Sequence, residues 1–202
     1  MNKKLNKTIK VYNDNAEDYA SKFDEWPRPK ELRKVFDLCH KSNPRVLELG
    51  CSNGKDVEEI LRKTNNYLGI DGAESLLNIA QNKFPEVKFQ ASRFEDLCFS
   101  DRQFDIVLDF CSLFHLNKKE SKKIINKIYL WLDTDGLLLI CAKKGNYQKN
   151  VNHAQGGKIQ YYYQPTDILN LAKDKFIQND FKIENRYGHD WFTIILKKKA
   201  LK

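Results

Sequence analysis

The chain has 202 residues, 41% of them hydrophobic, which fits one folded domain with an ample core and excludes a disordered chain. No apolar run approaches the length of a membrane span, and no apolar stretch follows the lysine-rich start as it would in a secretion signal. The five cysteines are odd in number and never spaced C-x-x-C. The sequence therefore predicts neither a disulfide framework nor a zinc site, and it indicates a reducing cytoplasm.

The formal net charge is +8, and lysine supplies most of the positive residues. Lysines gather at 118–127 and 197–199, where they would suit the phosphates of RNA. Arginine, the better planar partner for phosphate, is scarce, and aromatic residues are not interleaved with the lysines to stack on bases. The pattern therefore favours solvated helix surfaces over an RNA-binding face.

Apolar strands alternate with amphipathic helices, which predicts a mostly parallel sheet with helices on both faces. The turn at 188–190 is too short for a parallel crossover, so we expect one antiparallel edge strand. The one long irregular stretch is expected at 145–158. In chain order the expected elements are helices 10–20 and 28–41, strand 46–50, helix 55–64, strand 66–71, helix 73–82, strands 87–90 and 104–109, helix 118–132, strand 136–142, helix 165–178, and strands 181–187 and 191–198.

A glycine-bracketed turn, G-x-S-x-G at 50–54, joins the first expected strand to a helix, and the next strand ends on Asp71. Small residues let the backbone approach a ligand, and a carboxylate at the end of the second strand can hold ribose hydroxyls, so this is a nucleoside-binding unit. The dinucleotide fingerprint G-x-G-x-x-G is absent. Glu48, two positions before the first glycine, suits a ligand with a cationic end better than a pyrophosphate.

The run V-L-E-L-G-C-S-N-G at 46–54 resembles the first motif of class I S-adenosylmethionine-dependent methyltransferases. Segments 69–85, 104–109, 112–116 and 130–140 are similar to later parts of that family, in the same order, so the resemblance covers nearly the whole chain. It implies a doubly wound, seven-stranded Rossmann-like sheet in a single domain, 1–202, with N-terminal lid helices in 1–41 and the core in 42–202. It also implies S-adenosylmethionine as the cofactor and S-adenosylhomocysteine as the product.

The resemblance also implies roles for individual residues. Glu48 would face the methionine ammonium, and Asp71 would accept both ribose hydroxyls. Arg93 stands where the family usually has an acid for the adenine amino group, and an arginine cannot accept a hydrogen bond. The cofactor-binding residues expected on this basis are Glu48, Gly50, Cys51, Ser52, Gly54, Asp71, Gly72, Arg93, Phe94, Asp109, Phe110 and Tyr19.

His115 is the candidate base or substrate-orienting residue, and the alternative is a histidine that fills a loop by packing. Tyr12, Tyr19 and Trp26 are expected in the lid and Tyr161–Tyr163 in the acceptor pocket, unless these are ordinary core aromatics. The metal-binding Asp-Asn pair of catechol-type relatives is missing, so no metal is expected. The resulting prediction is in-line methyl transfer to a small molecule with an O, N or S nucleophile, without a membrane partner.

Three alternatives remain from the sequence. One is an RNA-modifying methyltransferase, and a second is a non-catalytic partner subunit that binds S-adenosylmethionine, which Arg93 alone supports. The third is an α/β-hydrolase with Ser52 as nucleophile, Asp109 as acid and His153 or His189 as base. Too few residues precede the turn for the strands of that fold, and no oxyanion-hole segment lies upstream, so the hydrolase is the weakest. The acceptor and the oligomeric state stay open.

Overall fold

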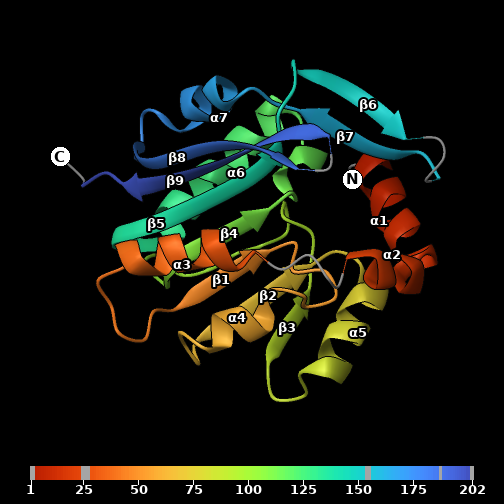
Figure 1. Cartoon of the computed structure of the whole chain (residues 1–202), viewed down its shortest axis with the longest axis horizontal. Helices are drawn as coiled ribbons and strands as arrows, with labels where there is room; N and C mark the ends of the chain where they lie inside the picture. The colour runs from red at the N-terminus through yellow and green to blue at the C-terminus, as the bar shows by residue number, and fades with distance from the viewer. Residues whose placement is uncertain (1–2, 24–27, 153–155, 187, 201–202) are drawn as a thin grey trace.

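The computed structural model describes residues 3–23, 28–152, 156–186 and 188–200 (Figure 1). The helices are α1 (Lys3–Asp14), α2 (Ala16–Phe23), α3 (Pro29–Leu38), α4 (Val57–Leu61), α5 (Glu74–Lys83), the 3-10 helix η1 (Leu113–His115), α6 (Lys118–Trp131) and α7 (Pro165–Ala172). The strands are β1 (Val46–Leu49), β2 (Tyr67–Asp71), β3 (Lys88–Ala91), β4 (Phe104–Phe110), β5 (Leu132–Lys143), β6 (Gln148–Asn152), β7 (Lys158–Tyr162), β8 (Phe176–Arg186) and β9 (His189–Lys198).

Seven of these strands form one sheet in the order β3-β2-β1-β4-β5-β9-β8, and β6 pairs with β7 in a separate hairpin. Every residue of β1 and β4 is buried, as expected for central parallel strands that are covered on both faces. β9 runs antiparallel to both β5 and β8, so the antiparallel strand lies one place in from the edge. The predicted seven-stranded, mostly parallel sheet is confirmed.

Helices cover both faces of the sheet (Figure 1). Leu32 and Val35 of α3 pack with Val46 in one buried cluster, while Ile125 of α6 packs with Leu47 in another. Neighbouring strand residues point to opposite faces, so Val46 and Leu47 assign α3 and α6 to opposite sides of β1. α4 shares the cluster of α3, and α7 shares that of α6. The doubly wound, Rossmann-like architecture follows.

The structure differs from the sequence-based expectation in three places. The first helix is divided into α1 and α2 at Asn15, whose side-chain amide donates to Val11 O over 2.8 Å and so engages a backbone carbonyl of α1. The helix expected at 165–178 ends at Ala172, and β8 already begins at Phe176. The stretch 145–158 is not irregular throughout, because β6 lies inside it and pairs with β7 through backbone hydrogen bonds.

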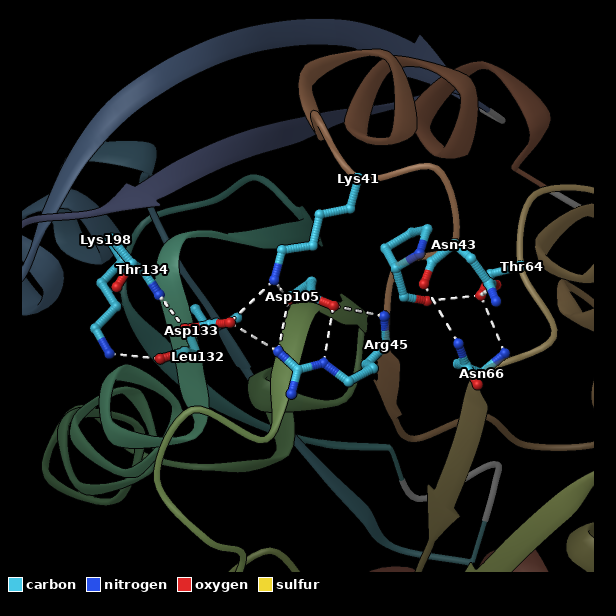
Figure 2. Close-up of polar contacts among 11 residues, drawn as sticks. Lys41, Asn43, Arg45, Thr64, Asn66, Asp105, Leu132, Asp133, Thr134 and Lys198 are labelled. Carbon is cyan, nitrogen blue, oxygen red and sulfur yellow. Dashed lines mark hydrogen bonds and ion pairs between the residues drawn. The ribbon is translucent and has the colours of Figure 1, made fainter.

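A network of charges ties together the amino ends of β1 and β4 (Figure 2). Asp105 is 4% exposed and accepts from Lys41 Nζ over 2.6 Å and from the Arg45 backbone N–H over 2.7 Å. Arg45 Nη2 also reaches Asp133, 2.9 Å away, at the start of β5. These residues lie at the amino ends of the parallel strands, on the side of the molecule opposite to the carboxyl ends.

We expect Asp105→Asn to lower the free energy of unfolding by about 2 kcal/mol at neutral pH, because it discards charge-assisted hydrogen bonds to a buried carboxylate. Burial opposes ionisation of Asp105, but the bonds from Arg45 and Lys41 outweigh it and hold the pKa at about 2. The stabilisation is therefore present above the ordinary pKa of about 4 and is lost as pH falls through about 2. Urea unfolding across this range measures the effect.

The exposed Asp101→Asn serves as the control for loss of one carboxylate. Wild type and Asp105→Asn should converge in stability at the acid end, while Asp101→Asn follows wild type throughout. An Asp105→Asn protein as stable as wild type at neutral pH would show that the network contributes nothing.

Candidate active site

A cavity of about 750 Å³ opens at the carboxyl ends of the central strands. β1 and β4 are neighbours, yet the chain after β1 passes to β2 and β3 on one side while β4 leads to β5 on the other. This reversal is the topological switch point, where open α/β sheets bind their ligands. Side chains from the ends of β1, β2, β4 and β5, from η1 and β7, and from α1, α2 and α3 line the cavity.

The turn after β1 is wedged between the ends of its two neighbours. Gly50 has φ +75°, and its N–H donates to Ile70 O over 2.7 Å at the end of β2. A Cβ atom on Gly50 would overlap the Cβ of Ser112, which follows β4. Ser52 has φ +56°, and its N–H donates to Asp71 over 2.9 Å. The turn therefore leaves backbone, with little side chain, at the cavity wall beside Gly50.

Asp71 lines the cavity with its carboxylate held in place. Oδ2 accepts from Ser52 N–H and Oδ1 from Ala73 N–H, each over 2.9 Å, while burial raises the pKa of the carboxyl above its ordinary value. A carboxylate oxygen can accept two hydrogen bonds, so each oxygen keeps capacity for a ligand hydroxyl. Ala73 is the N-cap of α5, so Asp71 does not serve that helix as its cap.

Glu48 also lines the cavity, but in a different electrostatic state from the one expected. It is 2% exposed and accepts from the Tyr67 hydroxyl over 2.6 Å. Burial, and next the nearby Asp56, raise the pKa of Glu48 to about 8. At neutral pH the group is therefore largely protonated unless a cation lies beside it.

Arg28 is a cation of this region that the sequence did not single out. Its Nη1 lies 3.1 Å from Asp56 Oδ2, its backbone N–H donates to the same carboxylate, and its guanidinium lies 4.8 Å from the Phe110 ring centroid. Burial opposes its charge, but Cys111 and Asp56 outweigh that effect and raise its pKa. Arg28 and Phe110 both line the cavity, so a fixed positive charge lies beside the end of β4.

On the side of β3, Gly72, Arg93 and Phe94 line the cavity as expected. The Arg93 side chain is engaged, however: Nη1 donates to Asn6 of α1 over 2.6 Å, and Nε donates to Asp96 over 3.2 Å. Arg93 thus joins the loop after β3 to α1. Phe94 is 8% exposed and packs into the core while keeping a place on the wall.

Three expected cofactor residues, Cys51, Gly54 and Asp109, are not among the residues that line the cavity. Asp109 is fully buried, and its Oδ1 accepts from Ser112 N–H over 3.2 Å and from Leu113 N–H over 2.9 Å at the start of η1. Burial raises the pKa of Asp109 to about 7. The position at a strand end suggested that Asp109 faces the ligand, but the turn into η1 engages its Oδ1 through backbone N–H groups.

His115 lines the cavity between α1 and β7. Its Nδ1 lies 2.6 Å from Ile159 O, and a carbonyl only accepts, so Nδ1 carries the hydrogen. Nε2 lies 3.1 Å from the Tyr12 hydroxyl and accepts from it. Burial, and to a lesser degree the charge of Lys158, lower the pKa of His115 to about 4. Both ring nitrogens are therefore occupied in a neutral imidazole that ties two walls together.

We expect His115 to make stability depend on pH. The unfolded chain binds a proton below about pH 6.5 whereas the folded histidine does not until about pH 4, so stability is full above the first value and falls as pH drops towards the second. His115→Gln removes this dependence, which is on the order of 3 kcal/mol. Urea unfolding from neutral pH downwards, beside the exposed His40→Gln as control, measures it. If the free energy of unfolding of His115→Gln fell with pH as steeply as that of wild type, His115 would not be the source of the dependence.

Some of the aromatic residues expected near the site line the cavity, and others are buried in the hydrophobic core. Tyr12 and Tyr19 line the cavity, edge to face with ring centroids 5.0 Å apart, whereas Trp26 lies outside the described residues. Of the three consecutive tyrosines only Tyr162 lines the cavity, and Tyr161 and Tyr163 are buried in the core.

Further cavity residues were missed from the sequence. Lys158 and Gln160 are two of them, and with Tyr162, which was expected, they line the cavity at every second position of β7, a period that the sequence displays and that marks one side of a strand. No local signal marks Arg186 and Trp191, because only the antiparallel pairing of β8 with β9 brings them to the cavity.

The hydrolase alternative does not fit this geometry. Ser52 Oγ lies 3.4 Å from Asn53 Oδ1, and no histidine in the described part of the chain shares a hydrogen bond with it. His189 begins β9 and is exposed, while His153 lies outside the described residues.

The described ranges also contain no cluster of three or more metal-ligating side chains. Every helix in them is too short or too polar to cross a membrane.

The chain is similar to known methyltransferases. A family described as "Methyltransferase domain" matches residues 46–136. The ubiquinone/menaquinone biosynthesis C-methyltransferase UbiE of Campylobacter jejuni is 28% identical, with 74% of each chain covered. The carboxy-S-adenosyl-L-methionine synthase of Staphylococcus epidermidis is 24% identical over 93% of this chain and 78% of its own.

Among solved structures, the Burkholderia thailandensis 1,6-didemethyltoxoflavin-N1-methyltransferase, with bound S-adenosylhomocysteine, shares the fold at a TM-score of 0.73 and 19% identity, over 95% of this chain and 88% of its own. The protein is thus similar to methyltransferases in sequence and in fold. It also has the glycine turn, the carboxylate at the end of β2 and the cavity at the switch point. The sequence similarity, the fold and the site together support a class I S-adenosylmethionine-dependent methyltransferase with S-adenosylmethionine as its cofactor.

Proposed function

We propose that this enzyme methylates a small-molecule acceptor inside the cavity at the switch point. The observation that carries the proposal is the cavity itself: about 750 Å³ extends from the residues expected to bind the cofactor to a second wall on β5, β7, β8 and β9. This volume is in the range of small-ligand sites and suits a cofactor with a compact partner. The relatives named for quinone biosynthesis and for a toxoflavin precursor support an acceptor of that kind.

The residues of the first wall fit S-adenosylmethionine. Asp71 has free acceptor capacity for the ribose hydroxyls, and the backbone at Gly50 leaves space for the amino acid portion. An ammonium beside Glu48 would lower the pKa of that carboxyl and restore its charge, while Arg28 suits the carboxylate. Phe94 supplies an apolar face for adenine, and Arg93 contributes by holding α1 against the loop.

The cofactor supplies an electrophilic methyl group, so the protein needs chiefly to align the acceptor and exclude water. Tyr12 and Tyr19, on α1 and α2, cover the cavity, and we propose that residues 1–41 act as its lid. His115 orients Tyr12 through their hydrogen bond. With a pKa of about 4 it is a weak base, which fits a positioning role better than removal of a proton from a weakly acidic acceptor.

The RNA alternative loses support from the surface lysines. Lys118 pairs with Asp167, and Lys127 donates to two backbone carbonyls, so these side chains are used in local contacts. Lys197 pairs with Asp135 in the same way. The non-catalytic alternative rested on Arg93, which the structure shows engaged with α1.

Two further parts of the proposal concern context. We place the enzyme in the cytoplasm, which the five free cysteines support, since paired cysteines are the rule in oxidising compartments. We also propose that the described core and lid act as a single catalytic domain. The sequence predicts an O, N or S atom as the methylated atom of the acceptor. The relatives named C-methyltransferases make a carbon atom a further candidate.

The test combines calorimetry with transfer of a labelled methyl group. The protein is titrated with S-adenosylmethionine and S-adenosylhomocysteine, and then incubated with labelled cofactor and pools of small acceptors, beside bulk RNA. Binding of both ligands and label in a small-molecule pool supports the proposal. Label in RNA alone would assign the enzyme to RNA modification, and failure to bind either ligand would remove the proposed function.

A further inference from the structure

The β7 wall of the cavity carries polar side chains that the cofactor does not require. Lys158, Gln160 and Tyr162 line the cavity, whereas Ile159 and Tyr161 between them are buried in the core. Successive residues of a strand point to opposite sides, so the first three share one side. The apolar side already provides the packing that holds β7 in place. The polar side is therefore available to a ligand.

Lys158 is the most unusual residue of this wall. It is 6% exposed, yet no carboxylate among the described residues pairs with its Nζ. The Nζ lies 4.7 Å from the ring centroid of Tyr12 and 5.7 Å from that of Tyr19, so two aromatic faces hold the ammonium over the cavity. Burial alone lowers the pKa of Lys158 to about 8, as expected where no negative charge lies nearby. An anion that enters the cavity would compensate this charge.

A second lysine lies on an adjoining part of the wall. Lys143 ends β5, and its Nζ lies 5.2 Å from the ring centroid of Tyr162. Burial lowers its pKa, and within the described ranges Lys143 also has no carboxylate partner. Tyr162 is a neighbour of Lys143 and shares the cavity side of β7 with Lys158. Lys143 thus lies beside Tyr162, and Lys158 lies four residues away along β7, with Gln160 in the strand between Lys158 and Tyr162.

The carboxylates of the cavity are used by other cations. Asp56 pairs with Arg28, and Glu31 and Glu184 both pair with Arg186. Glu48 and Asp71 belong to the cofactor side. Within the described residues, none of these acids forms a hydrogen bond or an ion pair with either lysine, so the protein does not balance the positive charge there.

We propose that the acceptor carries an anionic group, a carboxylate or a phosphate ester, which Lys158 binds with Gln160 as a further hydrogen-bond donor, while Lys143 adds positive charge at the Tyr162 end of the same wall. This inference rests on the proposed function, because it names the class of acceptor for the same cavity. The lysines line a cavity that α1 and α2 cover, not an open surface, which favours a small molecule over an RNA backbone. The group anchors the acceptor by one end and so presents its nucleophilic atom in a fixed direction.

The experiment uses the full chain saturated with S-adenosylhomocysteine and two matched probe pairs. Benzoate is compared with benzamide, and phenyl phosphate with phenol, by calorimetry or ligand-observed NMR. Wild type should bind the anionic member of at least one pair about tenfold more tightly than the neutral member. Preference in the first pair indicates a carboxylate and in the second a phosphate ester.

The variants separate this site from the fold and from the cofactor site. Lys158→Met should abolish the preference and keep the affinity for S-adenosylhomocysteine, while Lys158→Arg should keep both. Lys149→Met, at an exposed lysine of β6, controls for the loss of one charge. Equal binding of anion and neutral analogue, no anion binding, or a preference that survives in Lys158→Met would overturn the inference while cofactor binding stands. Failure of wild type to bind S-adenosylhomocysteine would instead overturn the proposed function.

Discussion

Asp71→Asn is expected to weaken the binding of S-adenosylhomocysteine by about 100-fold. The wild-type carboxylate is held by backbone N–H groups of Ser52 and Ala73 and keeps one acceptor position on each oxygen for a ribose hydroxyl. An amide at this position loses the charge and one of the two acceptor oxygens. Two charge-assisted hydrogen bonds to a buried ligand are worth about 3 kcal/mol together, which corresponds to a loss of this size.

Calorimetric titration of wild type and Asp71→Asn measures the change, and Asp37→Asn, at an exposed carboxylate of α3, is the matched control. The ribose contribution is isolated by comparing adenosine with adenine, since the preference for adenosine should disappear only in Asp71→Asn. Thermal unfolding of the variant, measured in parallel, tests whether the turn at Ser52 is intact. Retained affinity in a folded Asp71→Asn protein would exclude Asp71 from the ribose site.

The turn after β1 and the place of Asp71 were predictable because their signals are local. An apolar run makes β1, Gly50 permits the turn, and a second apolar run ends on Asp71. Parallel pairing of β1 with β2 then places the turn and the carboxylate side by side, and their separation along the chain does not matter. The seven-stranded sheet followed from the same alternation of strands and helices.

Other parts of the fold and of the site were not predictable in the same way. β6 contains a single aliphatic residue, Val151, and is held by backbone pairing with β7, so it leaves almost no pattern of hydrophobicity. Arg28 reaches the cavity through its ion pair with Asp56, a contact between residues far apart in the sequence. Asp109 was assigned to the ligand by its place at a strand end, and only the path of the chain into η1 brings the Leu113 N–H to its carboxylate.

Gly50→Ala is expected to lower the free energy of unfolding by about 3 kcal/mol. Two effects add: an L side chain is strained by about 1 kcal/mol at the observed φ of +75°, and the new Cβ overlaps the Cβ of Ser112. The second effect is that of an overpacked core, which costs about 1–3 kcal/mol. Ser112 is not free to move, because its hydroxyl donates to Leu49 O over 2.7 Å.

Gly188→Ala separates these two effects. Gly188 has φ +73°, almost the same as Gly50, but a Cβ there would meet nothing within 4 Å. Its substitution should therefore cost only the backbone strain, about 1 kcal/mol, and should leave the binding of S-adenosylhomocysteine unchanged. Equal losses of stability in the two variants, measured by urea unfolding, would mean that Ser112 yields to the added methyl group. A larger loss in Gly50→Ala identifies the contact between the turn after β1 and the end of β4 as the feature that requires glycine at this position, since backbone conformation is matched in the pair.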